Sequence, residues 1–251
     1  MDIILNEREW AEDAIESRSL GKRPAETLWR LARYYYQAEN RKKNDVRKEL
    51  ERFLLRCDPD IVLIKWSGTV DKVVKSCHKM PLIQIDGIPV TSKEMDVVKS
   101  ADGKQAQRLA FTLLCVAKYW NMVHTSNNGW TNIPDKDIMQ MANVKTSIKR
   151  QSEMLRKMKD GGLIGFSRKV DNLNIQVKFI DDDTDDMCMA VSDVRNIGNQ
   201  LMLYYGESYF RCEQCGVVIK RNSPAHKYCP KCAAEMYIKQ SVGAVMRSRC
   251  G

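Results

Sequence analysis

Four cysteines near the C-terminal end of this 251-residue chain have the types and spacing that most clearly indicate chemistry. They are Cys212, Cys215, Cys229 and Cys232, which form two C-x2-C pairs separated by thirteen residues. A C-x2-C turn directs two thiolates toward one point, and a second such turn completes the tetrahedral sulfur set that suits Zn²⁺. Because sulfur fills all four positions, none stays open for a catalytic water. The pattern therefore predicts one structural Zn²⁺ that folds this segment and takes no part in catalysis.

The residues around the cysteines fit such a site. Gly216 follows the first pair, where the turn needs a residue that tolerates unusual φ, and Pro230 stiffens the second pair. The stretch Phe210-Arg-Cys-Glu-Gln-Cys-Gly, continued by Lys-Tyr-Cys-Pro-Lys-Cys232, resembles a zinc ribbon. His226 lies three residues before Cys229 and could replace one cysteine as a ligand. Since four paired thiolates already satisfy zinc, we expect His226 to be a surface histidine.

The overall composition favours a polyanionic partner. The formal net charge is +9, with a pI near 9.1, which favours DNA and also suits RNA. The sequence contains no run of 18 apolar residues, and its first residues lack the pattern of a signal peptide. Nine cysteines without a signal peptide indicate a reducing compartment, where thiols bind metal rather than form disulfides. We therefore expect a cytoplasmic protein without a membrane partner.

The middle of the chain predicts a particular order of elements. Apolar periodicity indicates a helix from 104 to about 123, and a short extended piece follows at 130–133. Pro134 begins a short helix, a longer helix covers about 146–159, and two strands follow at 163–166 and 174–180. This order of elements resembles the winged helix-turn-helix family. The stretch Leu155…Met158-Lys-Asp-Gly-Gly-Leu-Ile164 is similar to the family's passage from the third helix into the first strand of the wing. The resemblance implies that the third helix is a recognition helix and that the hairpin is a wing, while a generic α+β core is the alternative.

Positive charge is concentrated on this predicted recognition helix and wing. Residues 145–169 contain eight Lys and Arg against two acidic residues, a balance of 8 − 2 = +6. We expect these charges to lie away from an apolar face formed by Ile148, Gln151, Leu155 and Met158. By the resemblance, the candidate nucleic-acid contacts are Lys145, Thr146, Ser147, Lys149, Arg150, Arg156, Arg168, Lys169 and Asn172. A solvated basic helix is the simpler interpretation of the same pattern.

The predicted fold class is α+β and mostly helical, with five segments. These are a helical N-terminal domain (1–80), a connecting strand-turn-helix (81–103), a winged helix-like domain (104–180), an acidic linker and helix (181–206), and a zinc ribbon with a C-terminal helix (207–251). Thr91 and Glu94 form a capping-box pattern that begins a helix through Ser100. This division into five segments predicts that metal removal unfolds the chain from about residue 207 and leaves the winged helix folded.

The sequence offers little support for an enzyme. It contains no phosphate-binding glycine loop, and none of its three histidines accompanies a Ser or Cys nucleophile pattern. We expect a non-enzymatic DNA-binding protein with a regulatory or replication role and no small-molecule substrate. Its modules are similar to those of winged-helix and zinc-ribbon proteins of bacterial phages and mobile elements. The alternatives are an accessory or inhibitor protein that docks on a host nucleoprotein complex, and a nuclease.

Overall fold

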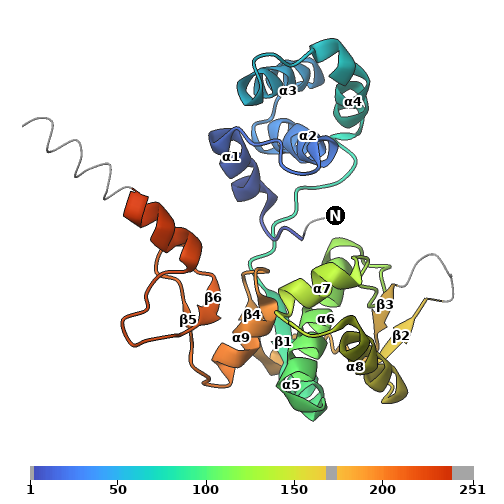
Figure 1. Ribbon diagram of the computed structural model, residues 1–251. Helices are drawn as coiled ribbons and strands as arrows, with labels where there is room; N and C mark the ends of the chain where they lie inside the picture. Colours follow the sequence, from blue (N-terminus) through green and yellow to red (C-terminus); the bar gives the residue numbers. More distant parts are fainter. Residues whose placement is uncertain (1–2, 168–173, 239–251) are drawn as a thin grey trace, which may run out of the picture. The chain divides into compact units, whose positions relative to one another are not determined.

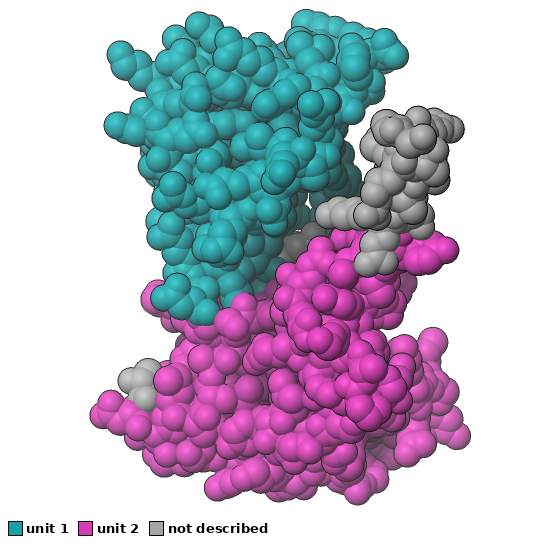
Figure 2. All heavy atoms as spheres, turned by 90° about the vertical axis from the view of Figure 1, so that its left-hand side faces the viewer, with its two compact units in different colours: residues 1–86 teal, residues 87–251 magenta. Residues whose placement is uncertain are grey.

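The computed structural model describes residues 3–167 and 174–238 (Figure 1). The chain divides into two compact units, Met1–Asp86 and Gly87–Gly251, which Figure 2 shows in different colours. The N-terminal unit is mostly helical, whereas the second unit combines helices with strands, and each pair of these strands forms its own small antiparallel sheet. The predicted α+β, mostly helical fold class is confirmed.

The N-terminal unit consists of helices around one apolar core. Its elements are α1 (Glu7–Ser17), α2 (Pro24–Arg33), the π-helical turn η1 (Tyr34–Ala38), α3 (Lys43–Cys57) and α4 (Leu63–Ser76). Pro24 occupies the first position of α2, where its fixed φ suits a helix start. Asn6 caps α1 by accepting the N–H groups of Arg8 and Glu9. Leu28, Leu50 and Phe53 are fully buried between the helices.

A buried carboxylate joins the two ends of this unit. Glu7 Oε1 accepts hydrogen bonds from Arg30 Nη1, at 2.7 Å, and from Arg33 Nη2. Glu7 Oε2 accepts the N–H of Ile83 at 3.0 Å, and Arg33 donates to the carbonyl of Pro81 at 2.9 Å. All three charged side chains are at most 2% exposed. Such a network keeps buried charges paired, and it fixes residues 81–83 against α1.

The second unit is organised around α6 (Gly103–Val123), which is buried on nearly all sides from Leu109 to Trp120. It contacts α5 (Ser92–Ser100), α7 (Asp135–Met141) and α9 (Ile197–Tyr204). It also contacts β1 (Ile88–Thr91), which pairs antiparallel with β4 (Met187–Val191). The predicted capping box is present, since Thr91 accepts the N–H of Glu94 and Glu94 accepts the N–H of Thr91. A helix buried on all sides is the element on which the others pack.

The cationic segment forms a helix followed by a hairpin. After α7, a turn at Ala142–Val144 leads to α8 (Ile148–Asp160), and Ser147 caps α8 by accepting the N–H of Arg150. The strands β2 (Ile164–Phe166) and β3 (Ile175–Val177) then pair antiparallel, and Trp130 forms an isolated bridge with Gln176. In Figure 1, α8 and the β2–β3 hairpin lie next to each other, and α8 contacts β2.

The acidic run at 181–186, which the composition predicts to be a linker, contacts the α5–α6 region. Lys118, inside α6, donates to both carboxylate oxygens of Glu94, at 2.8 and 2.9 Å, and to the carbonyl of Asp181 at 3.0 Å. The backbone N–H of Asp181 donates a hydrogen bond to Glu94 Oε1 at 2.8 Å. The short 3-10 turn η2 (Thr184–Asp186) then leads into β4. The run is therefore fixed at its first residue and again where β4 pairs with β1.

The helix α9 connects the α6–α7 region with the last part of the chain. Its residue Asn199 is 3% exposed and accepts hydrogen bonds from Arg108, at 2.7 Å, and from Asn143 in the turn before α8, at 3.0 Å. The Asn199 amide donates to the carbonyl of Val218 at 2.9 Å. Its neighbour Gly198 lies so close to the turn that a Cβ there would overlap the Ala142 carbonyl.

The last described segment begins with a hairpin. The strands β5 (Tyr209–Arg211) and β6 (Val218–Lys220) pair antiparallel, and both contact α9. Residues 230–238 are helical, so this helix begins inside the second cysteine pair, whereas the sequence predicts a helix only after Cys232. We call residues 209–238 the cysteine hairpin segment.

Candidate metal centre and cationic helix

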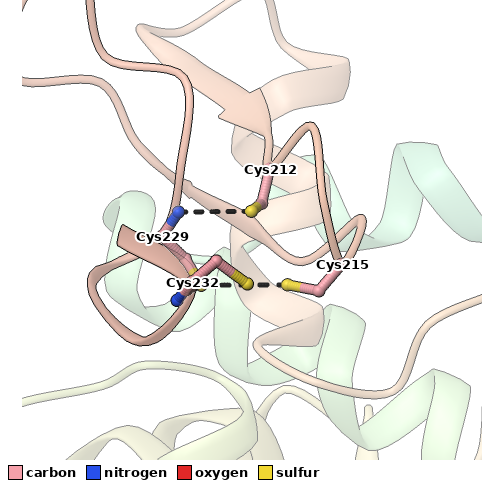
Figure 3. A group of neighbouring side chains, drawn as sticks. All are labelled: Cys212, Cys215, Cys229 and Cys232. Carbon is pink, nitrogen blue, oxygen red and sulfur yellow. Dashed lines mark hydrogen bonds between the residues drawn. The ribbon is translucent and has the colours of Figure 1, made fainter. Parts of the chain in front are cut away.

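The four predicted cysteines form one cluster. The Sγ atoms of Cys212, Cys215, Cys229 and Cys232 all lie within 4.8 Å of one another, and the side chains converge on one point (Figure 3). All four are free thiols, and Cys215 Sγ lies 3.8 Å from Cys229 Sγ. Four sulfurs held about 2.3 Å from one ion would be separated by about 3.8 Å. The cluster therefore has the dimensions of a tetrahedral metal site.

Two local structures direct these thiols. The first pair lies in the turn between β5 and β6, where Cys212 N–H donates to the carbonyl of Val217 at 3.0 Å and Gly216 N–H donates to that of Cys212 at 2.9 Å. Gly216 has a φ of +73°, a conformation that side chains with a Cβ rarely adopt. The second pair lies at the start of the final helix, where the N–H of Ala233 donates to the carbonyl of Cys229 at 2.9 Å. The turn and the helix start together bring ligands far apart in sequence to one point.

The surroundings of the sulfurs favour a thiolate at Cys212. Burial raises the pKa of this thiol, but N–H groups of Cys229, Cys215 and Gln214 outweigh burial and lower the pKa to about 6. The N–H of Cys229 donates to Cys212 Sγ at 3.2 Å, and the N–H of Cys232 donates to Cys229 Sγ at 3.4 Å. By contrast, burial and the neighbouring thiols raise the pKa of Cys232. A cation at the centre would favour the deprotonated form of every thiol in the cluster.

His226 does not belong to the cluster. Its Nδ1 accepts the N–H of Asn222 at 3.3 Å, and its ring lies 4.8 Å from that of Phe210. The cluster that could hold a metal ion contains the four cysteines without it. This placement agrees with the expectation that sulfur alone provides the ligands.

Arg195 and Asn199 support the cluster from outside, and the sequence did not identify them. Arg195 donates to the carbonyl of Cys215 and forms an ion pair with Asp193 at 2.7 Å. Asn199 binds the carbonyl of Val218, beside the first cysteine turn. No motif marks either residue, because the carbonyls of Cys215 and Val218 that they bind lie about twenty residues away in the chain.

The predicted nucleic-acid contacts that the structure describes lie at one end and along one side of α8. Lys145, Ser147, Lys149, Arg150 and Arg156 are exposed, and Thr146 is half-buried. In the described part of the chain, no acidic side chain forms an ion pair with Lys145, Lys149, Arg150 or Arg156. The predicted wing contacts Arg168, Lys169 and Asn172 lie outside the described residues.

Other cations of α8 already have partners. Lys157 pairs with Asp102 at 2.8 Å, and Lys159 lies over the ring of Phe166, 5.4 Å from its centroid. Both belong to the second half of the helix. Among the α8 cations of the described residues, Lys149 and Arg150 in the first turn and Arg156 in the second half have neither an ion pair nor a ring contact.

One sequence expectation for α8 is wrong. The core side of the helix consists of Met154, Leu155 and Met158, whereas Ile148 is 81% exposed. Gln151 is half-buried and donates to the carbonyl of Thr146 at 3.0 Å. Periodicity places Ile148 on the same stripe as Leu155, but the first turn of α8 extends beyond the elements that cover the stripe. An isoleucine thus lies in solvent among the cations.

Among the described helices, none has both the length and the apolar character needed to cross a membrane. In comparisons with known proteins, no family model matches the chain, and neither does any curated protein or any solved structure.

Proposed function

We propose that residues 104–180 form a winged helix-turn-helix that binds duplex DNA through α8, and that the four cysteines hold one structural Zn²⁺. The observation that carries the proposal is the exposed beginning of α8 and the turn before it, where Lys145, Lys149 and Arg150 form no ion pair with an acidic side chain of the described residues. A helix is the element that enters the major groove, and cations beside it bind phosphates.

The order and pairing of the elements support a winged helix. The elements follow one another as α6, the bridge residue Trp130, α7, α8, β2 and β3. The Trp130–Gln176 bridge adds a third extended segment next to the β2–β3 hairpin. The order of a short extended piece before the second helix and a hairpin after the third is the order on which the resemblance to the family rests. The buried side of α8 faces the core through Met154, Leu155 and Met158, so its cationic side is free for a ligand.

The ligand set supports zinc as the metal. Four thiolates are soft ligands, and a closed tetrahedral set of sulfur is typical of structural Zn²⁺ sites. Zinc would supply folding free energy rather than catalysis, because the four cysteines leave no position for a substrate. Purified protein should contain about one zinc ion per chain by elemental analysis. Cys215→Ser should lose the metal, whereas Cys57→Ser, which changes a half-buried free thiol of the N-terminal unit, should retain it.

DNA binding is tested by selection on random duplexes, followed by titration of the selected site over a range of salt concentrations. Neutralisation of about six phosphates would give a slope of log K against log salt of about −5. The double variant Lys149→Ala/Arg150→Ala should weaken binding about tenfold or more. Lys72→Ala/Lys75→Ala removes the same charge from exposed positions on α4 and is the matched control.

Other outcomes would point to the alternatives. If the protein binds no duplex but captures a defined protein–RNA complex, docking on a nucleoprotein machine would replace the proposal. Cleavage of DNA with a divalent metal would indicate a nuclease. Equal binding by the α8 variant and the α4 control would show that α8 is not the contact.

A further inference from the structure

Ile148 is the most exposed of the large apolar side chains in the described residues, at 81%. It is the first residue of α8, directly after the capping residue Ser147. An isolated exposed apolar side chain is ordinary on a protein surface and needs no explanation by itself. The position of Ile148 is informative because Lys145, Lys149 and Arg150 surround it in the sequence, are exposed, and form no ion pair with the acidic side chains that the structure describes.

The cap determines where this side chain lies. Ser147 has extended backbone angles, with φ −60° and ψ 151°, and its Oγ accepts the N–H of Arg150 at 3.4 Å. Ile148 is thereby fixed at the first helical position, one turn before the half-buried Gln151 and beyond the buried residues Met154 and Leu155. A β-branched side chain at this position has little rotamer freedom to lose when a ligand covers it. Ile148 is therefore an exposed apolar side chain held in a restricted conformation at the beginning of a cationic helix.

The surrounding charge selects the kind of surface that could cover Ile148. A polyanion would satisfy the neighbouring cations, and the ligand must present an apolar group within it. In the major groove of DNA, the C5-methyl group of thymine is the apolar group at the base edges. We infer that Ile148 contacts a thymine methyl group and contributes sequence preference to duplex binding, an inference that rests on the proposed function.

The test removes the methyl group alone. Each thymine of the selected site is replaced in turn by deoxyuridine, which keeps base pairing and lacks only the C5-methyl. One replacement should weaken binding of the unaltered protein by about threefold to tenfold. Ile148→Ala should weaken binding to the thymine site by a similar factor and should bind the thymine and deoxyuridine sites equally. Because Ile148 is mostly exposed, the variant should keep its fold.

Two controls separate this inference from the proposed function. Ile64→Ala changes a 77% exposed isoleucine of the N-terminal unit and should keep the full thymine preference. Ile148→Val keeps a β-branched side chain, so this variant should keep part of the thymine preference. If duplexes bind but no deoxyuridine replacement matters, or if Ile148→Ala keeps the preference, the inference is overturned and the proposed function stands. If the unaltered protein binds no duplex, both are overturned.

Discussion

In the N-terminal unit, thirteen buried residues from all four α-helices, η1 and the residue after α4 form one core. The cysteine hairpin segment has a cluster of four buried residues, three of them cysteines. The first cluster is large enough to drive folding by removal of apolar surface from water. The second is too small for that and brings four thiols within 4.8 Å instead. The comparison teaches that a segment with too small an apolar core can instead gather a set of thiols that could hold a metal ion, whereas the N-terminal unit depends on apolar burial.

Metal removal should give the largest difference between the two regions. Apparent free energies for structural Zn²⁺ in small domains are about 10 kcal/mol or more, so chelation should unfold the cysteine hairpin segment. Hydrogen exchange measured by mass spectrometry, with and without chelator, should show loss of protection at residues 209–220 and retained protection in α3. Equal loss in α3 would contradict the comparison. Protection in α8 then tests whether the winged helix survives chelation, as the sequence predicts.

Truncation of the apolar core should have the next largest effect. Phe53 is fully buried, and Phe53→Ala should lower the free energy of unfolding of the N-terminal unit by about 3–5 kcal/mol. Urea unfolding followed by tryptophan fluorescence measures this change, because Trp10, Trp29 and Trp66 pack against the same core. Leu55→Ala, at a 41% exposed position of α3, is the control and should cost less than about 1 kcal/mol. Zinc content should be the same in both variants.

Changes of pH should affect the two regions in opposite directions. Burial raises the pKa of Tyr35 from 10.0 to about 12, so its contribution to stability is complete below pH 10 and is lost as the pH rises toward 12. The pKa of Cys212 is lowered to about 6 from its ordinary 9.0, so its contribution is present above pH 9 and is lost as the pH falls through 6. For Tyr35 we expect a change on the order of 1 kcal/mol after screening by solvent, and for Cys212 we expect a loss of bound zinc at low pH.

The measurement is urea unfolding at pH 9, 10 and 12 for the N-terminal unit, and zinc retention from pH 8 to pH 5 for the cysteine hairpin segment. Tyr35→Phe should reduce the change in unfolding free energy of the N-terminal unit between pH 9 and pH 12. Zinc retention that does not change down to pH 5 would contradict the second expectation.

The smallest effect should come from a surface ion pair of the cysteine hairpin segment. Lys227 Nζ lies 3.8 Å from Glu213 Oε1, and both side chains are more than half exposed. Such pairs contribute about 1 kcal/mol or less, so Lys227→Ala should change zinc affinity little. The backbone hydrogen bond from Glu213 N–H to the carbonyl of Lys227, at 3.1 Å, is kept in this variant. A large loss of affinity would show that surface charge supports the segment more than coordination does.

Features that depend on short sequence separations were predictable. The cysteine spacing identified all four members of the cluster, and the Thr91–Glu94 capping box was found from a three-residue pattern. Periodicity also gave the course of α6 and the existence of α8, but not the exposure of Ile148. Hydrophobic periodicity identifies which side chains share one face of a helix. It does not show how far along that face the neighbouring elements of the fold extend.

Features that depend on distant partners were not predictable. The partners of Asn199 include Arg108, which is 91 residues away, and Glu7 binds arginines 23 and 26 residues away. Buried polar groups are satisfied by whatever the fold brings near them, and a single sequence carries no periodic signal for such pairs. For the same reason, the orientation of the cysteine hairpin segment on α9 could not be predicted from the sequence.

The close approach at Gly198 has a consequence for substitution screens. Every residue type other than glycine would place a Cβ against the Ala142 carbonyl, so nearly all substitutions at position 198 should lower the yield of folded protein. A screen scored by DNA binding alone would then rank position 198 with residues of a ligand site, although it belongs to neither the cysteine cluster nor the exposed side of α8. Scoring each variant for abundance as well as binding would separate positions where two backbones touch from positions that touch a ligand.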